Sequence, residues 1–126
     1  MSTETRARRT PGPDHPITVS PTGHRVVARV GETVVAESTG ALTLQESTYP
    51  PAYYVPLADV DAALLRRSAT TTWCPYKGEA SYYSLVVDGT ELTDAVWSYQ
   101  QASPAVAGIA GFVAFYTDRV DVTVAD

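Results

Sequence analysis

Apolar residues at every second position are the feature that most constrains this chain, because that spacing gives a strand one buried face. Val26, Ala28 and Val30 follow it, and residues 34–38 repeat the alternation after the turn residues Gly31-Glu32. The two runs predict a β-hairpin. A further short strand is predicted over residues 41–45.

A second β region is predicted in the other half of the chain. Residues 70–74 are β-branched and aromatic, and residues 79–87 alternate again. Asp88-Gly89 is typical of a two-residue hairpin loop, which would set Leu85 opposite Leu92 and Tyr83 opposite Asp94. Residues 112–116 and 120–124 complete the chain as strand-like segments.

Prolines determine the predicted backbone conformation of the segment between these regions. Residues 49–56 contain three prolines, which fix φ and remove backbone donors, so the segment is predicted to be an extended edge strand. Asp59 is then predicted to cap a short helix that runs through Leu64 to Arg66. A second short helix is predicted from Pro104 to about Gly111.

About ten short strands and two short helices follow from these patterns, and the strands do not alternate with helices. This favours a mainly β fold, a small barrel or two packed antiparallel sheets. Residues 1–14 hold almost nothing apolar and are predicted to be a disordered, dispensable tail. Residues 15–126 are predicted to form one domain, since a chain of 126 residues suits a single core.

Charge and composition exclude several function classes. The net charge is −5 and Lys77 is the one lysine, so the basic surface that nucleic acid requires is absent from the composition. The longest apolar run, residues 105–116, contains two glycines and is too short to span a bilayer. With no signal-peptide pattern and a single cysteine, Cys74, we expect a cytoplasmic protein, monomeric or homodimeric.

The chain resembles the domain of unknown function 427 family. The resemblance rests on these stretches: His15-Pro16-Ile17, 25–38, 44–46 leading into 49–56, 72–84 with its Cys74-Pro75-Tyr76-Lys77-Gly78 block, 97–99, and 109–116 with 118–120. It implies a β-tent-like fold, in which two antiparallel sheets meet at an angle, and it brings no established activity. The structural zinc of several β-tent proteins needs two cysteine pairs, which one cysteine cannot supply.

A nucleotidyltransferase label sometimes attached to that family finds no support in these residues. Such enzymes need a Gly-Ser followed by paired metal-binding carboxylates. Asp59-Val60-Asp61 is the one tight acidic pair, and helix capping explains it. Because His15 and His24 are the only histidines, we expect the protein to fold without metal or cofactor.

Three residues carry alternative interpretations. Lys77 is either an exposed turn lysine paired with Glu79 or a ligand anchor or proton donor. Glu46 interrupts an apolar alternation, so it is either solvated or fixed in a hydrogen-bond network, where burial would raise its pKa. Cys74 is either a small buried residue or a nucleophile activated by Lys77.

Seven of eight tyrosines and both tryptophans lie between Tyr49 and Tyr99, which suits either an aromatic core or a ligand pocket. Our first hypothesis is a small-molecule-binding domain. The alternatives are a cofactor-free acid–base enzyme that uses Glu46 or Lys77 in the same pocket, and a protein-interaction module. We expect Glu46 and Lys77 to share one cavity. The predicted ligand-binding residues are Glu46, Tyr53, Tyr54, Trp73, Cys74, Tyr76, Lys77, Tyr83, Trp97 and Tyr99.

Overall fold

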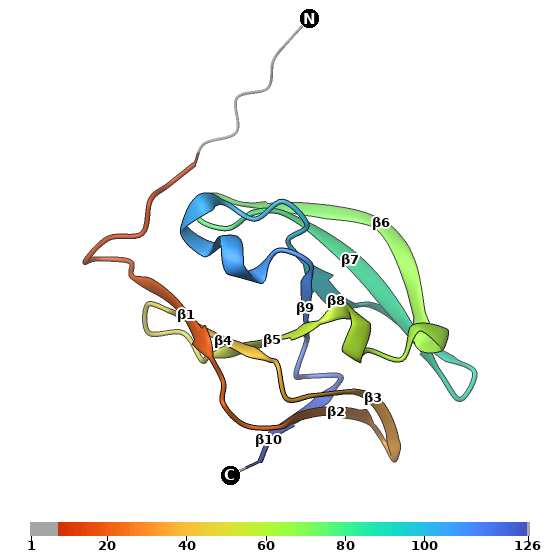
Figure 1. Ribbon diagram of the computed structural model, residues 1–126. Helices are drawn as coiled ribbons and strands as arrows, with labels where there is room; N and C mark the ends of the chain where they lie inside the picture. The colour runs from red at the N-terminus through yellow and green to blue at the C-terminus, as the bar shows by residue number, and fades with distance from the viewer. Residues whose placement is uncertain (1–7, 126) are drawn as a thin grey trace, which may run out of the picture.

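The computed structural model describes residues 8–125, and within them ten strands form two antiparallel sheets (Figure 1). The larger sheet has the order β1-β4-β5-β9-β8-β7-β6, and the smaller has the order β10-β2-β3. The strands are β1 Ile17–Pro21, β2 Val26–Val30, β3 Thr33–Ser38, β4 Leu42–Glu46, β5 Ala52–Pro56, β6 Leu65–Cys74, β7 Gly78–Val87, β8 Thr90–Ser98, β9 Phe112–Phe115 and β10 Asp121–Val124. The predicted mainly β, two-sheet, tent-like architecture is confirmed, and neither sheet closes into a barrel.

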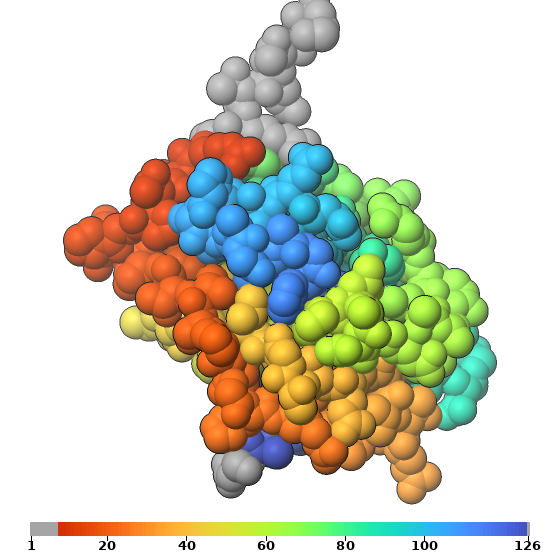
Figure 2. Space-filling model, in the orientation of Figure 1, coloured from red at the N-terminus to blue at the C-terminus, as the bar shows by residue number. Residues whose placement is uncertain are grey.

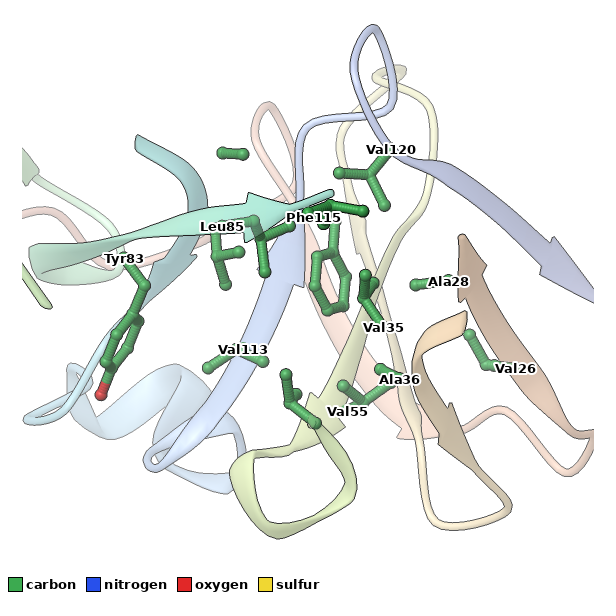
Figure 3. Packing of buried hydrophobic residues seen from close by; sticks show 14 of the residues in the cluster. Val26, Ala28, Val35, Ala36, Val55, Tyr83, Leu85, Val113, Phe115 and Val120 are labelled. Atoms are coloured by element: carbon green, nitrogen blue, oxygen red, sulfur yellow. The ribbon is translucent and has the colours of Figure 1, made fainter. Parts of the chain in front are cut away.

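The middle strands of the larger sheet are buried on both faces, whereas the edge strand β6 is mostly exposed. One core lies between the two sheets, where Val55, Val113 and Phe115 of the larger sheet meet Val35 and Val26 of the smaller one (Figure 3). The other core lies on the opposite face, where Tyr54 and Ala114 pack with Ile109. Neighbouring residues of one strand therefore belong to different cores, because successive side chains of a strand point to opposite faces.

Ile109 belongs to η3, a 3-10 helix over Pro104–Ile109 that covers this second core and contacts β1 (Figure 1). Pro104 stands in its first turn, as predicted, because proline tolerates a position that needs no backbone donor. In the space-filling view the N-terminal segment and η3 lie side by side (Figure 2). Arg8 Nη1 donates to Ser103 Oγ at 2.9 Å, and Arg9 N donates to Pro75 O at 2.9 Å.

These two contacts involve part of the segment that the sequence assigns to a tail. Residues 1–7 lie outside the described residues, and Gly12 forms a bridge with His15. The division into a tail and a single domain stays a prediction. The structure adds that Arg8, Arg9 and His15 each contact the domain, at Ser103, Pro75 and Glu46. In residues 8–125, no helix has the length and apolar character required to cross a membrane.

The hairpin at Asp88-Gly89 forms, but part of its predicted register is wrong. Leu85 does oppose Leu92, whereas Tyr83 opposes Val96 and not Asp94. A β-bulge in β8 causes the shift, since β8 advances four residues there while β7 advances two. Asp94 adopts a φ of 53° in the bulge, its N–H donates to Ser84 Oγ at 3.0 Å, and its carboxylate accepts from Thr70 Oγ1 at 2.7 Å.

The helix predicted after Asp59 is wrong. Two single 3-10 turns, Leu57–Asp59 and Ala62–Leu64, stand in its place, and the chain enters β6 at Leu65. Asp61, not Asp59, caps a turn, by accepting from Ala63 N at 3.1 Å. Asp59 instead accepts from Ser38 Oγ at 2.6 Å, a contact between the first 3-10 turn and β3 that local propensity cannot foresee.

The Pro-rich segment is extended, as predicted, but β5 is not an edge strand. It lies between β4 and β9 in the larger sheet. Its pairing with β9 covers Val55↔Val113 and Pro56↔Phe112, while its pairing with β4 continues to Ala52. From Tyr54 back to Ala52, β5 is therefore paired with β4 but not with β9, and we call the resulting gap between β5 and β9 the seam. This part of β5 is paired on one side only, as an edge strand is.

Candidate functional site

Three ionisable side chains meet at one rim of the larger sheet. Lys77 Nζ lies 2.7 Å from Glu46 Oε1, and His15 Nε2 lies 2.9 Å from Glu46 Oε2. Glu46 ends β4, Lys77 lies in the turn between β6 and β7, and His15 precedes β1. The Tyr76 ring stacks on His15 with centroids 4.0 Å apart. We call His15, Glu46, Tyr76 and Lys77 the rim cluster.

The turn that presents Lys77 is built by its neighbours. Lys77 N donates to Cys74 O at 3.2 Å and closes the turn, while its own carbonyl accepts from Ser103 N at 2.9 Å. Gly78 follows with a φ of 110°, and a Cβ on it would lie 3.1 Å from Gln101 O. Glycine is required there on both counts, backbone conformation and space. The turn is thereby fixed against the segment that leads into η3.

Lys77 pairs with Glu46, so the two side chains lie as close together as a shared cavity would require, but that they line one cavity stays a prediction. The side chains of Lys77, Glu46 and His15 are 15%, 12% and 22% exposed. Burial alone would raise the pKa of Glu46, but hydrogen bonds from Lys77 and His15, together with their charges, outweigh it and lower that pKa. Glu46 is therefore held as a carboxylate, which does not suit a proton donor near neutral pH.

Behind the rim cluster lies a layer of buried aromatic hydroxyl groups. Lys77 Nζ stands 5.7 Å from the centroid of the Tyr99 ring, which is buried in the second core beside Tyr54. Trp97 Nε1 donates to Tyr54 Oη at 2.9 Å, and the two rings meet edge to face. Burial raises the pKa of both Tyr54 and Tyr99, so both phenols are neutral at neutral pH.

At the other end of this layer the seam opens into a cavity of about 240 Å³. Trp97 and Tyr116 form its aromatic corner, with ring centroids 4.6 Å apart and planes inclined by 50°. Burial, followed by the hydrogen bond with Tyr82, raises the pKa of Tyr116 to about 12. We call this cavity the seam groove, and it is lined by Pro50, Pro51, Ala52, Tyr53, Trp97, Ala114, Phe115, Tyr116, Thr117 and Val122.

A chain of hydroxyl groups connects the seam groove to the edge of the sheet. Tyr116 Oη lies 3.4 Å from Tyr82 Oη, which lies 2.9 Å from Thr72 Oγ1 of the edge strand β6. The rings of Tyr82 and Tyr116 are parallel within 3°. These contacts with Tyr82 restrict the orientation of the Tyr116 ring, although Tyr116 follows the last residue of β9.

The predicted site residues thus divide among several places. Glu46, Tyr76, Lys77 and Tyr99 belong to the rim, Tyr53 and Trp97 line the seam groove, and Tyr54 joins the two. Cys74 is partly buried against the second core. Tyr83 packs in the other core beneath Arg67, and Trp73 lies under Arg8. The assignment of all ten residues to a ligand site stays a prediction.

Sequence reasoning missed His15 and Tyr116 as members of a site. His15 enters the sequence analysis only as a possible metal ligand. Its spacing from Glu46 forms no motif, because the two residues meet only through the pairing of β1 with β4. Tyr116 lies outside the aromatic-rich stretch of residues 49–99 that drew attention. Its signal was its place at the end of the strand after Ala114, on the Trp97 side of the sheet.

The acidic pair that resembles a nucleotidyltransferase motif is used structurally. Asp59 accepts from Ser38 and Asp61 caps the turn at Ala63. Within residues 8–125, no group of three or more His, Cys, Asp or Glu side chains gathers as metal ligands would. That the protein folds without metal stays a prediction.

Comparison of the sequence with known families assigns the chain to one of them. No curated protein matches the sequence. A match to the family described as a domain of unknown function (DUF427) covers residues 18–126, which include nine strands from β2 to β10 and most of β1. The chain therefore belongs to the domain of unknown function 427 family.

Proposed function

We propose that this domain binds a small organic molecule in the seam groove. The observation that carries the proposal is the aromatic corner of Trp97 and Tyr116, which opens into a cavity where two strands of one sheet separate. Ligand pockets are concave, mostly apolar and typically ~300–1,000 Å³ in volume. The seam groove, at about 240 Å³, lies just below that range, so it suits a ligand smaller than a drug-sized molecule.

The groove has the mixture of surfaces that such pockets use. Prolines and aromatic rings provide flat apolar walls, and Thr117 and Tyr116 contribute hydroxyl groups. The indole N–H of Trp97 already donates to Tyr54, so Trp97 offers its ring and not its donor. Ligand contact through Trp97 would therefore be by stacking and dispersion, which favour a ring or a compact apolar group.

The rim cluster supports a ligand site less well. Both carboxylate oxygens of Glu46 accept hydrogen bonds within the cluster, and the charge of Lys77 is neutralised there. A ligand at the rim would have to displace one of these contacts before it could bind. An acid–base role for Glu46 or Lys77, our alternative hypothesis, needs the same displacement.

A fluorescence titration tests the proposal. Trp73→Phe leaves Trp97 as the single tryptophan, so its emission reports on the groove. We expect members of a library of small ring compounds to change this emission and to raise the melting temperature. Tyr116→Ala should weaken binding at least tenfold.

Tyr76→Ala is the matched control, because it removes the same side chain from the rim cluster and should leave affinity unchanged. If Tyr76→Ala weakens binding as much as Tyr116→Ala, the ligand occupies the rim. A library that changes neither emission nor melting temperature would end the proposal.

A further inference from the structure

We propose that the ligand of the seam groove carries a methylated ammonium group, so the groove recognises an organic cation. This inference rests on the proposed function, since it names the ligand class for the same cavity. It is argued from three features: the rings that line the groove, the hydrogen-bonding groups in its walls, and the charges around its mouth.

Aromatic rings surround the groove from three parts of the sheet. Tyr53 comes from β5, Trp97 from β8 and Tyr116 from the end of β9. The face of each ring carries partial negative charge and attracts a cation within ~6 Å of its centroid, most strongly for tryptophan. The 50° inclination between Trp97 and Tyr116 makes a corner, which offers two rings to one compact group.

The walls of the groove favour a cation that needs no hydrogen bonds. None of the ten lining side chains carries a formal charge, and the Tyr116 phenol is protonated at neutral pH because its pKa is about 12. An anion would lose its hydration there without a charged partner. A primary ammonium would need acceptors for three N–H groups, and among the lining side chains only the hydroxyl groups of Tyr53, Tyr116 and Thr117 can accept. A trimethylammonium group has no N–H and presents methyl groups to the rings.

The charges near the groove partly offset one another, because Arg119 Nε lies 3.9 Å from Asp118 Oδ1. Asp118 and Asp121 flank Thr117 and Val122 in sequence, and both are exposed. Arg119 opposes them, with its guanidinium 5.6 Å from the Tyr116 ring centroid. That guanidinium also donates to the carbonyl oxygens of Thr93 and Asp94. The Tyr116 ring therefore already attracts one cation, while Arg119 reduces the attraction for a second.

Choline and 3,3-dimethylbutan-1-ol provide the test, because they share one shape and differ in a single charge. Both would be titrated into Trp73→Phe protein at fixed ionic strength, with Trp97 emission and NMR shifts as readouts. We expect choline to bind about fivefold more tightly or better, the size of a partly exposed cation–π interaction. Tyr116→Ala should remove this preference, and Tyr76→Ala should retain it.

The outcomes separate this inference from the proposed function. Equal affinity for choline and its neutral isostere, or ring compounds that bind while choline does not, would overturn the cation inference and leave ligand binding intact. Tighter binding of an anionic ring compound than of choline would overturn it too. Failure of every compound, charged or neutral, would end both proposals.

Discussion

The rim cluster and the seam groove adjoin the same aromatic layer, yet they use their side chains in opposite ways. The rim cluster holds charges that satisfy one another, with Glu46 accepting from both Lys77 and His15. The seam groove is lined by aromatic, apolar and neutral polar side chains, and none of them carries a formal charge. Charged residues stand out in a sequence, but a binding site needs side chains that are not already paired with other residues of the protein.

The topology explains why the charged side chains of the rim cluster pair with one another. Glu46 lies near one edge of the larger sheet, in β4 next to the edge strand β1, while Lys77 follows the opposite edge strand, β6. Their ion pair joins elements from the two ends of the larger sheet, which is curved (Figure 1). We therefore infer that the ion pair acts as a structural clasp. The seam has no such clasp, because β5 and β9 separate after Val55.

The largest expected effect comes from breaking this ion pair. Lys77→Met leaves the partly buried Glu46 carboxylate without its main partner, which should cost about 2–3 kcal/mol of unfolding free energy. For a domain of this size the melting temperature should fall by about 10 °C. Thermal unfolding followed by circular dichroism measures both quantities.

The double variant Glu46→Gln/Lys77→Met is the control, since it removes both charges together. It should recover part of the loss and give a coupling free energy in a double-mutant cycle. An unchanged melting temperature in Lys77→Met would show that the pair does not hold the rim. Lys77 would then return as a candidate ligand anchor.

The pH dependence of stability gives a second contrast. The folded-state pKa of Glu46 lies below its ordinary value of 4.5, so its contribution is present above that value and is lost as pH falls through the lowered pKa. Between about pH 5 and pH 3 the wild type should therefore lose stability faster than Glu46→Gln.

Glu37→Gln is the matched control for this measurement. Glu37 pairs with Arg25 at the surface, where the two side chains are 49% and 54% exposed, and such pairs contribute little. This variant should keep the wild-type slope. Parallel curves for the wild type and Glu46→Gln would mean that the rim cluster does not hold Glu46 ionised.

Removal of a groove wall should affect stability less than removal of the clasp. Tyr116 is 36% exposed and follows the last residue of β9, so Tyr116→Ala should cost about 1 kcal/mol. Chemical denaturation of the variant beside Lys77→Met measures the difference. A loss as large as that of Lys77→Met would mean that the Tyr116 ring is a structural support and not a wall kept for a ligand.

Much of the fold follows from local patterns, and the failures share a cause. The strand periods and the turns at Gly31-Glu32 and Asp88-Gly89 act over a few residues, and the structure bears them out. The bulge at Asp94 depends on Ser84, Thr70 and Arg119, which lie far from it in sequence. Asp59, the predicted cap of the absent helix, likewise accepts from a residue distant in sequence, Ser38.

The candidate site divides in the same way. The proximity of Glu46 and Lys77 was predictable, because strand ends and turns gather at a common rim. The seam was not, because it exists where pairing between β5 and β9 stops, and no residue in either strand signals that end. Tyr53 and Trp97 were expected to bind a ligand in one pocket with Lys77, whereas they line a separate cavity.

The smallest expected effect concerns the N-terminal segment beside the rim cluster. Deletion of residues 1–14 removes the Arg8–Ser103 and Arg9–Pro75 hydrogen bonds and the Gly12–His15 bridge, but it keeps His15 itself. Arg8 and Arg9 are exposed, and contacts made by exposed side chains contribute little, so the melting temperature should fall by only about one or two degrees. The Glu46-dependent pH slope should persist, because the His15–Glu46 contact needs no residue before His15.

A loss comparable to that of Lys77→Met, with a flattened slope, would show that residues 8–14 hold His15 on Glu46. The clasp would then extend along the N-terminal segment, and the contrast between an occupied rim and an open groove would include that segment as a third part.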